Sequence, residues 1–272
     1  MLKQRVLTAI PLAALVVWGI LSQPENIIFY ALLCVVCVSA WEWSRLSGVQ
    51  NILLRLIYAV AITAATYFSQ KILAENQHWL NGVFLVTVTA WLLAIYHMFT
   101  KGPQPANQDL SVAKLLIGVV ALIPPILALM LIRAESAQWL FYCLSLVWIA
   151  DIGAYFSGKR FGKNKLAPML SPGKTKEGMY GAIFATAIYS LIASALFELQ
   201  YIEMLMLLII TALATFISVA GDLFVSLLKR EKDLKDTGNI LPGHGGILDR
   251  IDSVLTSAPL LALLLNLVIF NA

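Results

Sequence analysis

The chain has 272 residues, of which 60% are hydrophobic and 12% are charged, and its formal net charge is +4. A soluble globular domain usually carries roughly 25% charged residues, because its surface must be hydrated. This composition excludes an ordinary soluble enzyme and indicates an integral membrane protein.

Long apolar runs recur along the whole chain. About 20 such residues cross the hydrocarbon layer as one α-helix, so we predict an all-α, polytopic membrane protein with about nine transmembrane helices. The expected spans are 6–22, 26–43, 52–69, 79–98, 112–132, 138–157, 179–197, 203–226 and 254–271. We predict one membrane domain, 1–272, with N-terminal helices in about 1–135 and catalytic helices and two loops in about 136–272.

Lys and Arg residues are unevenly distributed between the two sides of these spans. With the N-terminus in the cytoplasm, all but two of the 19 Lys and Arg residues fall in cytoplasmic segments, the exceptions being Lys71 and Arg133. Cytoplasmic loops of membrane proteins carry an excess of these residues. The bias predicts that both long loops are cytoplasmic and that the C-terminus is outside.

The first long loop, about 158–178, contains the run Ser171-Pro-Gly-Lys-Thr-Lys-Glu-Gly178. A phosphate-binding P-loop would need a glycine where Pro168 stands and a parallel strand before it, and neither condition is met. Four lysines nevertheless form a candidate anion-binding patch: Lys163, Lys165, Lys174 and Lys176. Cytoplasmic topology alone would explain the abundance of lysine but not its arrangement with Ser, Pro and Gly.

The second long loop, about 229–253, mixes acids that can hold a divalent cation with bases that can hold phosphate. Asp249 and Asp252 are one helical turn apart if the last helix begins there. Glycines flank His244, so backbone amides could approach an anion closely. The alternative is a hydrated charged loop that caps a helix, but the combination of residues favours a site.

Two acids lie at matching ends of predicted spans. Asp151 is near the end of the sixth span, and Asp222 follows Gly221 near the end of the eighth. An ionisable residue inside a span is expensive and indicates function, unless it is close enough to the interface to stay hydrated. Their proximity to the two charged loops favours function.

The pattern from Ser226 to Asp252 resembles the signature of the phosphatidate cytidylyltransferases, or CDP-diacylglycerol synthases. The residues that carry the resemblance are Ser226, Lys229, Arg230, Lys235, Asp236, His244, Gly245, Gly246, Asp249, Arg250 and Asp252. Upstream, Asp151, Ser171, Pro172, Lys174 and Glu177 look like the family's first loop. The resemblance covers most of the chain, is densest over 148–252, and looks like that of a bacterial member.

The resemblance implies that CTP and phosphatidate are converted to CDP-diacylglycerol and pyrophosphate with Mg²⁺, in phospholipid biosynthesis. It also implies an enzyme of the bacterial inner membrane, in contact with membrane lipid and without a nucleic-acid partner. A homodimer is left open. A lipid substrate needs a membrane cavity and a nucleotide needs the cytoplasm, and both requirements meet where the charged loops join the helices.

Both substrates are anions, so cations are needed to suppress their repulsion. The expected metal ligands are Asp222, Asp249 and Asp252, with Asp236 as a further candidate. The expected catalytic residues are Asp222, Lys229, Arg230, Lys235, Asp236, His244, Asp249 and Arg250. The expected substrate-binding residues are Asp151, Ser171, Lys174, Lys176, Glu177, Ser226, Gly245 and Gly246. No general base is assigned, because the attacking phosphate is already ionised.

Two other functions remain as alternatives. A CDP-alcohol phosphotransferase would need an Asp-x-x-Asp-Gly-x-x-Ala-Arg run, which the sequence lacks. A transporter with an acidic ion site should place its polar groups near mid-membrane, in broken helices of two repeats. Here the acids gather at one face and no repeat is visible.

Overall fold

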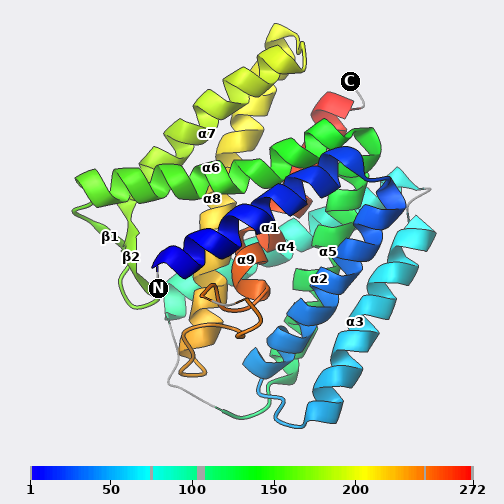
Figure 1. Cartoon of the computed structure of the whole chain (residues 1–272), viewed down its shortest axis with the longest axis vertical. Helices are drawn as coiled ribbons and strands as arrows, with labels where there is room; N and C mark the ends of the chain where they lie inside the picture. Colours follow the sequence, from blue (N-terminus) through cyan, green and yellow to red (C-terminus); the bar gives the residue numbers. More distant parts are fainter. Residues whose placement is uncertain (1, 74–75, 103–107, 242, 271–272) are drawn as a thin grey trace.

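The computed structural model describes residues 2–73, 76–102, 108–241 and 243–270. These residues form a helical bundle with one small hairpin (Figure 1). The helices are α1 (Leu2–Ser22), α2 (Glu25–Leu46), α3 (Ile52–Leu73), α4 (Gln77–Lys101), α5 (Val112–Glu135), α6 (Ala137–Phe161), α7 (Lys176–Leu196), α8 (Tyr201–Arg230) and α9 (Leu248–Leu265), followed by the π-helical turn η1 (Asn266–Phe270). The predicted all-α class is confirmed.

Eight of the described helices, α2 to α9, are long and apolar enough to cross a membrane, counting α9 together with η1. The segment Ile10–Ser22 of α1 is also apolar, but it is shorter than these eight spans. The polytopic architecture expected from the apolar runs is therefore confirmed. In Figure 1 the end of η1 lies near the top of the view, and the start of α1 lies lower, at the left.

The helices extend beyond the apolar runs that predicted them. The last span was expected from residue 254, whereas α9 begins at Leu248. Hydropathy marks only the apolar part of a helix, and the first turns of α9 carry Asp249, Arg250 and Asp252. As a result, the two acids of this segment lie on a rigid helix rather than on a loop.

A hairpin occupies part of the first long loop. Its strands are β1 (Lys165–Ala167) and β2 (Ser171–Thr175), which pair in antiparallel fashion. Thr175 ends β2 and also caps α7, because its hydroxyl oxygen accepts a hydrogen bond from the Gly178 N–H at 3.0 Å. The hairpin is thus tied directly to a membrane helix, which limits where Lys174 can reach.

The C-terminal helix α9 lies in the interior of the bundle, in contact with α8, α5, α4, α6 and α2. Most of its residues are buried. In Figure 1 the connection between α8 and α9 lies at the same end of the bundle as the α2–α3 connection. The N-terminal and C-terminal halves of the chain therefore share one core.

The α2–α3, α4–α5 and α8–α9 connections lie together at this end and are joined by hydrogen bonds and an ion pair. Ser111 N–H donates to the Ser47 carbonyl at 2.8 Å, which joins the segment before α5 to the one after α2. The Lys232 ammonium donates to the Asp109 carbonyl at 2.9 Å, and Lys114 pairs with Glu231 at 2.7 Å. Burial, followed by repulsion from Lys114, lowers the pKa of Lys232. The α8–α9 connection is consequently braced by the first half of the chain.

Candidate active site

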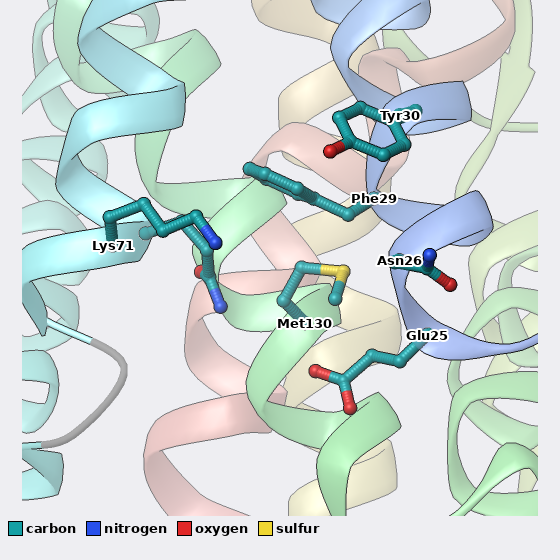
Figure 2. A pocket seen from close by; sticks show the side chains of 7 residues that line it. Glu25, Asn26, Phe29, Tyr30, Lys71 and Met130 are labelled. Atoms are coloured by element: carbon teal, nitrogen blue, oxygen red, sulfur yellow. The ribbon is translucent and has the colours of Figure 1, made fainter.

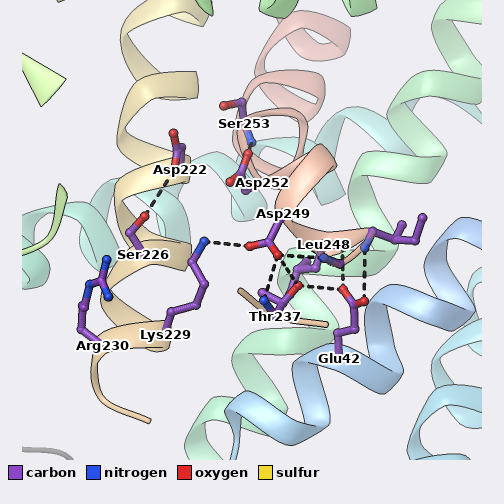
Figure 3. Close-up of polar contacts among 12 residues, drawn as sticks. Glu42, Asp222, Ser226, Lys229, Arg230, Thr237, Leu248, Asp249, Asp252 and Ser253 are labelled. Carbon is purple, nitrogen blue, oxygen red and sulfur yellow. Dashed lines mark hydrogen bonds and ion pairs between the residues drawn. The ribbon is translucent and has the colours of Figure 1, made fainter. Parts of the chain in front are cut away.

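Close packing of α8 on α9 brings two carboxylates together. A Cβ atom at Gly221 would overlap the Thr256 side chain and stand 3.0 Å from the Asp252 carbonyl oxygen, so only glycine permits this approach. Asp222, the next residue, faces Asp252 across the two helices (Figure 3). Asp252 is 9% exposed, and within the described residues its carboxylate accepts one hydrogen bond, from the Ser253 N–H at 2.7 Å.

The first loop reaches this pair through Lys174. The Lys174 ammonium lies 2.5 Å from Asp222 Oδ2 and also donates to the Val219 carbonyl at 3.3 Å. On the other side, the Ser226 hydroxyl donates to Asp222 Oδ1 at 3.3 Å. The side chains of Asp222 and Lys174 keep about a quarter of their surface exposed, so this pair is accessible to a ligand.

Asp249 occupies a more enclosed position one turn earlier on α9. Its Oδ1 accepts from the Lys229 ammonium at 2.7 Å. Its Oδ2 accepts from the Thr237 N–H at 2.8 Å, the Gly246 N–H at 2.9 Å and the Thr237 hydroxyl at 3.0 Å (Figure 3). Asp249 is one of the three expected metal ligands, and both of its oxygens accept hydrogen bonds from protein donors. Its geometry is that of an anchor for the α8–α9 connection.

The structure adds an acid that the motif analysis did not identify. Glu42, on α2, is 2% exposed and accepts hydrogen bonds from the Leu248 N–H at 2.8 Å and the Ile247 N–H at 3.2 Å. It therefore caps the start of α9, where a carboxylate is favoured by the helix dipole. A signal was present in the sequence, because Glu42 is an acid at the end of an apolar run.

A cavity of about 480 Å³ opens beside these acids. Most of its wall is apolar and comes from α1, α2, α5, α6 and α9, with residues such as Val16, Val36 and Leu129. Its polar lining consists of Asp151, His244, Asp249, Arg250, Asp252 and Ser253. Such a cavity can accept a molecule that is apolar along most of its length and charged at one end.

Several predicted residues surround this centre without entering it. The Glu177 carboxylate accepts from Asn164 Nδ2 at 2.7 Å and from the N–H groups of Lys163 and Asn164, so it holds the turn after α6 rather than lying free for a substrate. Arg230 is exposed and donates to the Leu170 carbonyl of the hairpin at 3.5 Å. Ser171 lies half-buried on β2.

The remaining predicted residues lie on the accessible surface of the same end or close to Asp249. Lys176, Lys235 and Asp236 are exposed. Gly245 adopts φ +82°, a conformation that favours glycine, and a Cβ atom there would stand 2.8 Å from Asp249 Oδ2. Gly246 donates its N–H to Asp249. The two glycines therefore shape the turn around this carboxylate.

A second cavity, of about 400 Å³, has a different character. It is lined by the start of α2, the end of α3 and part of α5, including Glu25, Lys71 and Phe29 (Figure 2). No predicted site residue lines it among those that the structure describes. The predicted chemistry therefore gathers at one end of the bundle.

Comparison with known proteins places this chain in a well-populated group. The model of the cytidylyltransferase family matches residues 3–268. Phosphatidate cytidylyltransferase from Pseudomonas aeruginosa is 37% identical over 275 residues, which cover 97% of each chain. The enzyme of the same name from Haemophilus influenzae is 34% identical over 95% of this chain and 96% of its own. That from Bacillus subtilis is 47% identical over 129 residues, about half of each chain.

Proposed function

The chain belongs to the cytidylyltransferase family, and we propose that the site described above transfers the cytidylyl group of CTP to phosphatidate. The products are CDP-diacylglycerol and pyrophosphate. The observation that carries this proposal is the cavity whose apolar wall ends at Arg250, Asp252 and Asp151. A diacyl lipid matches the apolar part of the cavity, and Arg250, together with a cation held by the neighbouring aspartates, would balance the charge of its phosphate head.

The reaction exchanges one phosphoanhydride for another. A phosphate oxygen of phosphatidate bonds to the α-phosphorus of CTP, and the bond from that phosphorus to the oxygen bridging the β-phosphorus breaks. Pyrophosphate leaves with the electron pair of that bond. Nucleophile and electrophile are both anionic, so fixed positive charge near the reacting groups lowers the barrier.

Two basic residues are placed to supply that charge. Arg250 lines the cavity and can hold the phosphate of phosphatidate, while the acyl chains occupy the apolar part. Lys174 approaches Asp222 from the hairpin and can contact the phosphates of CTP. Lys229, one of the expected catalytic residues, pairs its ammonium with Asp249, and 13% of its side chain is exposed. We therefore assign it the role of holding Asp249.

Magnesium fits Asp222 and Asp252 better than the three aspartates first expected. Mg²⁺ usually takes one or two carboxylates, with water and substrate phosphates completing its shell. Within the described residues no group of three or more His, Cys, Asp or Glu side chains could hold a metal, which matches such a sparse set of protein ligands. When bound, the ion would neutralise the phosphates and polarise them. Asp249, whose oxygens accept hydrogen bonds from Lys229, Thr237 and Gly246, would hold the α8–α9 connection in place beside the ion.

This assignment predicts the outcome of a labelling experiment with purified protein. CTP labelled at the α-phosphate should transfer its label to lipid only when phosphatidate is present. CTP labelled at the γ-phosphate should release its label as pyrophosphate and leave the lipid unlabelled. An α-label that never enters lipid would exclude the proposed reaction.

The same assay tests the metal, because carboxylates and two anionic substrates share one site. Excess chelator should reduce the rate by about 100-fold or more, and added Mg²⁺ should restore it. A calcium-saturated chelator provides the matched control for effects of the chelator itself. Full turnover in excess chelator without added metal would contradict a magnesium requirement.

We further propose that the site faces the cytoplasm of a bacterial inner membrane. The charge bias of the connections supports this orientation, since CTP is cytoplasmic. A reporter that is active only in the cytoplasm should be silent when fused after Ala272 and active when fused to the N-terminus. Strong activity of the C-terminal fusion would contradict the orientation or the odd number of spans.

A further inference from the structure

Glu42 is a buried acid supplied to the site by the N-terminal half of the chain. Burying a carboxylate is costly unless hydrogen-bond donors surround it. Glu42 has three: the Leu248 N–H, the Ile247 N–H and the Thr237 hydroxyl, the last at 2.9 Å. These donors come from both ends of the turn that leads into α9. One side chain of α2 thus fixes a turn about 200 residues away in sequence.

The turn is built to leave room for this carboxylate. A Cβ atom at Gly238 would overlap Glu42 Oε1. A Cβ atom at Gly246 would overlap both Glu42 oxygens and the Thr237 hydroxyl. Only glycine fits at these two positions, on opposite sides of the turn, while Glu42 occupies its observed place. The turn is therefore shaped around the Glu42 carboxylate.

Thr237 connects Glu42 to Asp249. Its hydroxyl lies 2.9 Å from Glu42 Oε2 and 3.0 Å from Asp249 Oδ2, and it is 1% exposed. A hydroxyl has a single proton to donate, so the two carboxylates share it. Any displacement of Glu42 therefore changes the hydrogen bonding of Asp249, which in turn holds Lys229.

We propose that Glu42 is a positioning residue for the transfer reaction: it holds the start of α9, and through Thr237 it orients Asp249, before substrates bind. This inference rests on the proposed function. Glu42 does not line the cavity in the part of the chain that the structure describes, whereas Asp249, Arg250 and Asp252 do. Glu42 thus acts through the residues of α9 and makes no contact with a substrate in the cavity.

Glu42→Gln tests the proposal, because it keeps the shape but turns an amide N–H₂ toward buried donors. It should lower kcat by about 10- to 100-fold, the scale found for groups that orient a catalytic site. The KM for CTP should stay within about twofold, since no substrate contact is lost. Trypsin should cleave the exposed turn after Lys235 faster than in the parent protein, a readout that does not depend on activity.

Thr237→Val provides an independent route to the same link. It removes the shared hydroxyl, while the Thr237 N–H bond to Asp249 remains available. We expect kcat to fall by about 10-fold. Because both changes break one chain of contacts, the double variant Glu42→Gln with Thr237→Val should be no slower than Glu42→Gln alone. If the fold-reductions in kcat of the two single variants multiply in the double variant, Glu42 and Thr237 act independently and the proposed link between them is wrong.

Matched controls separate positioning from folding. Glu25→Gln lies on the same helix at the far end, and Thr66→Val removes a buried hydroxyl that bonds the Ile62 carbonyl of its own helix. Both should retain the parent kcat. If Glu42→Gln yields too little folded protein, Thr237→Val decides the question. If the parent protein is active and both Glu42→Gln and Thr237→Val keep kcat within about twofold of it, this proposal is overturned. If the parent protein itself does not catalyse the transfer, the proposed function is overturned instead.

Discussion

Asp249→Asn is expected to lower the turnover number for CDP-diacylglycerol formation by about 100-fold or more. In the native site both oxygens of Asp249 accept hydrogen bonds, and the Lys229 ammonium lies 2.7 Å away. The amide of Asn offers one acceptor oxygen and points an N–H₂ group at donors. Lys229 then keeps its charge without a carboxylate to balance it, in a site where the Asp249 side chain is 4% exposed. Breaking such a buried pair typically costs about 3–5 kcal/mol.

The measurement is CTP-dependent product formation by purified variants, with folding checked by size-exclusion profile and thermal unfolding. Asp233→Asn is the matched control, because Asp233 is an exposed acid of the same connection and its φ of 54° suits Asn. It should behave as the parent protein. A well-folded Asp249→Asn enzyme that retains half of its activity would remove Asp249 from the site.

Asp222→Asn is expected to reduce turnover by a similar factor, about 100-fold or more, for a different reason. Asp222 is partly exposed, pairs with Lys174 and faces Asp252. Removing its charge weakens a hard-cation ligand and releases the hairpin lysine. The Mg²⁺ concentration for half-maximal rate should therefore rise for Asp222→Asn and stay within about twofold of the parent value for Asp249→Asn.

Titration of the rate with Mg²⁺ at saturating CTP makes this comparison. Asp252→Asn should resemble Asp222→Asn, because both acids are assigned to the ion. The double variant at 222 and 249 should be little worse than either single one, because both changes disable the same α8–α9 site and their effects are then not additive. An unchanged Mg²⁺ requirement in Asp222→Asn would sink the metal assignment. If the Mg²⁺ concentration for half-maximal rate rose only in Asp249→Asn, Asp249 would be a metal ligand after all.

The class of the protein and the region of its site follow from local properties of the sequence. Crossing a membrane depends on the apolarity of consecutive residues, so the helical bundle was predictable from hydropathy alone. The motif from Ser226 to Asp252 predicted that the chemistry lies at the α8–α9 connection, and the structure places Lys174 beside Asp222 of α8. These conclusions needed no knowledge of which helix packs on which.

The role of each side chain was decided by packing between distant segments. Glu42 belongs to α2, yet it caps α9, and nothing in its own neighbourhood reveals its partners in Ile247 and Leu248. Asp222 and Asp249 look alike in sequence, but α8 leaves the first accessible while the turn around Gly246 encloses the second.

Sequence spacing shows which groups are available, because residue type and charge are local. Which oxygen accepts from which donor depends on where two helices meet. Gly221 lets α8 approach α9, and Gly246 lets Glu42 reach the turn. Only the tertiary structure contains those approaches, and they separate a carboxylate open to a cation from one that anchors the backbone.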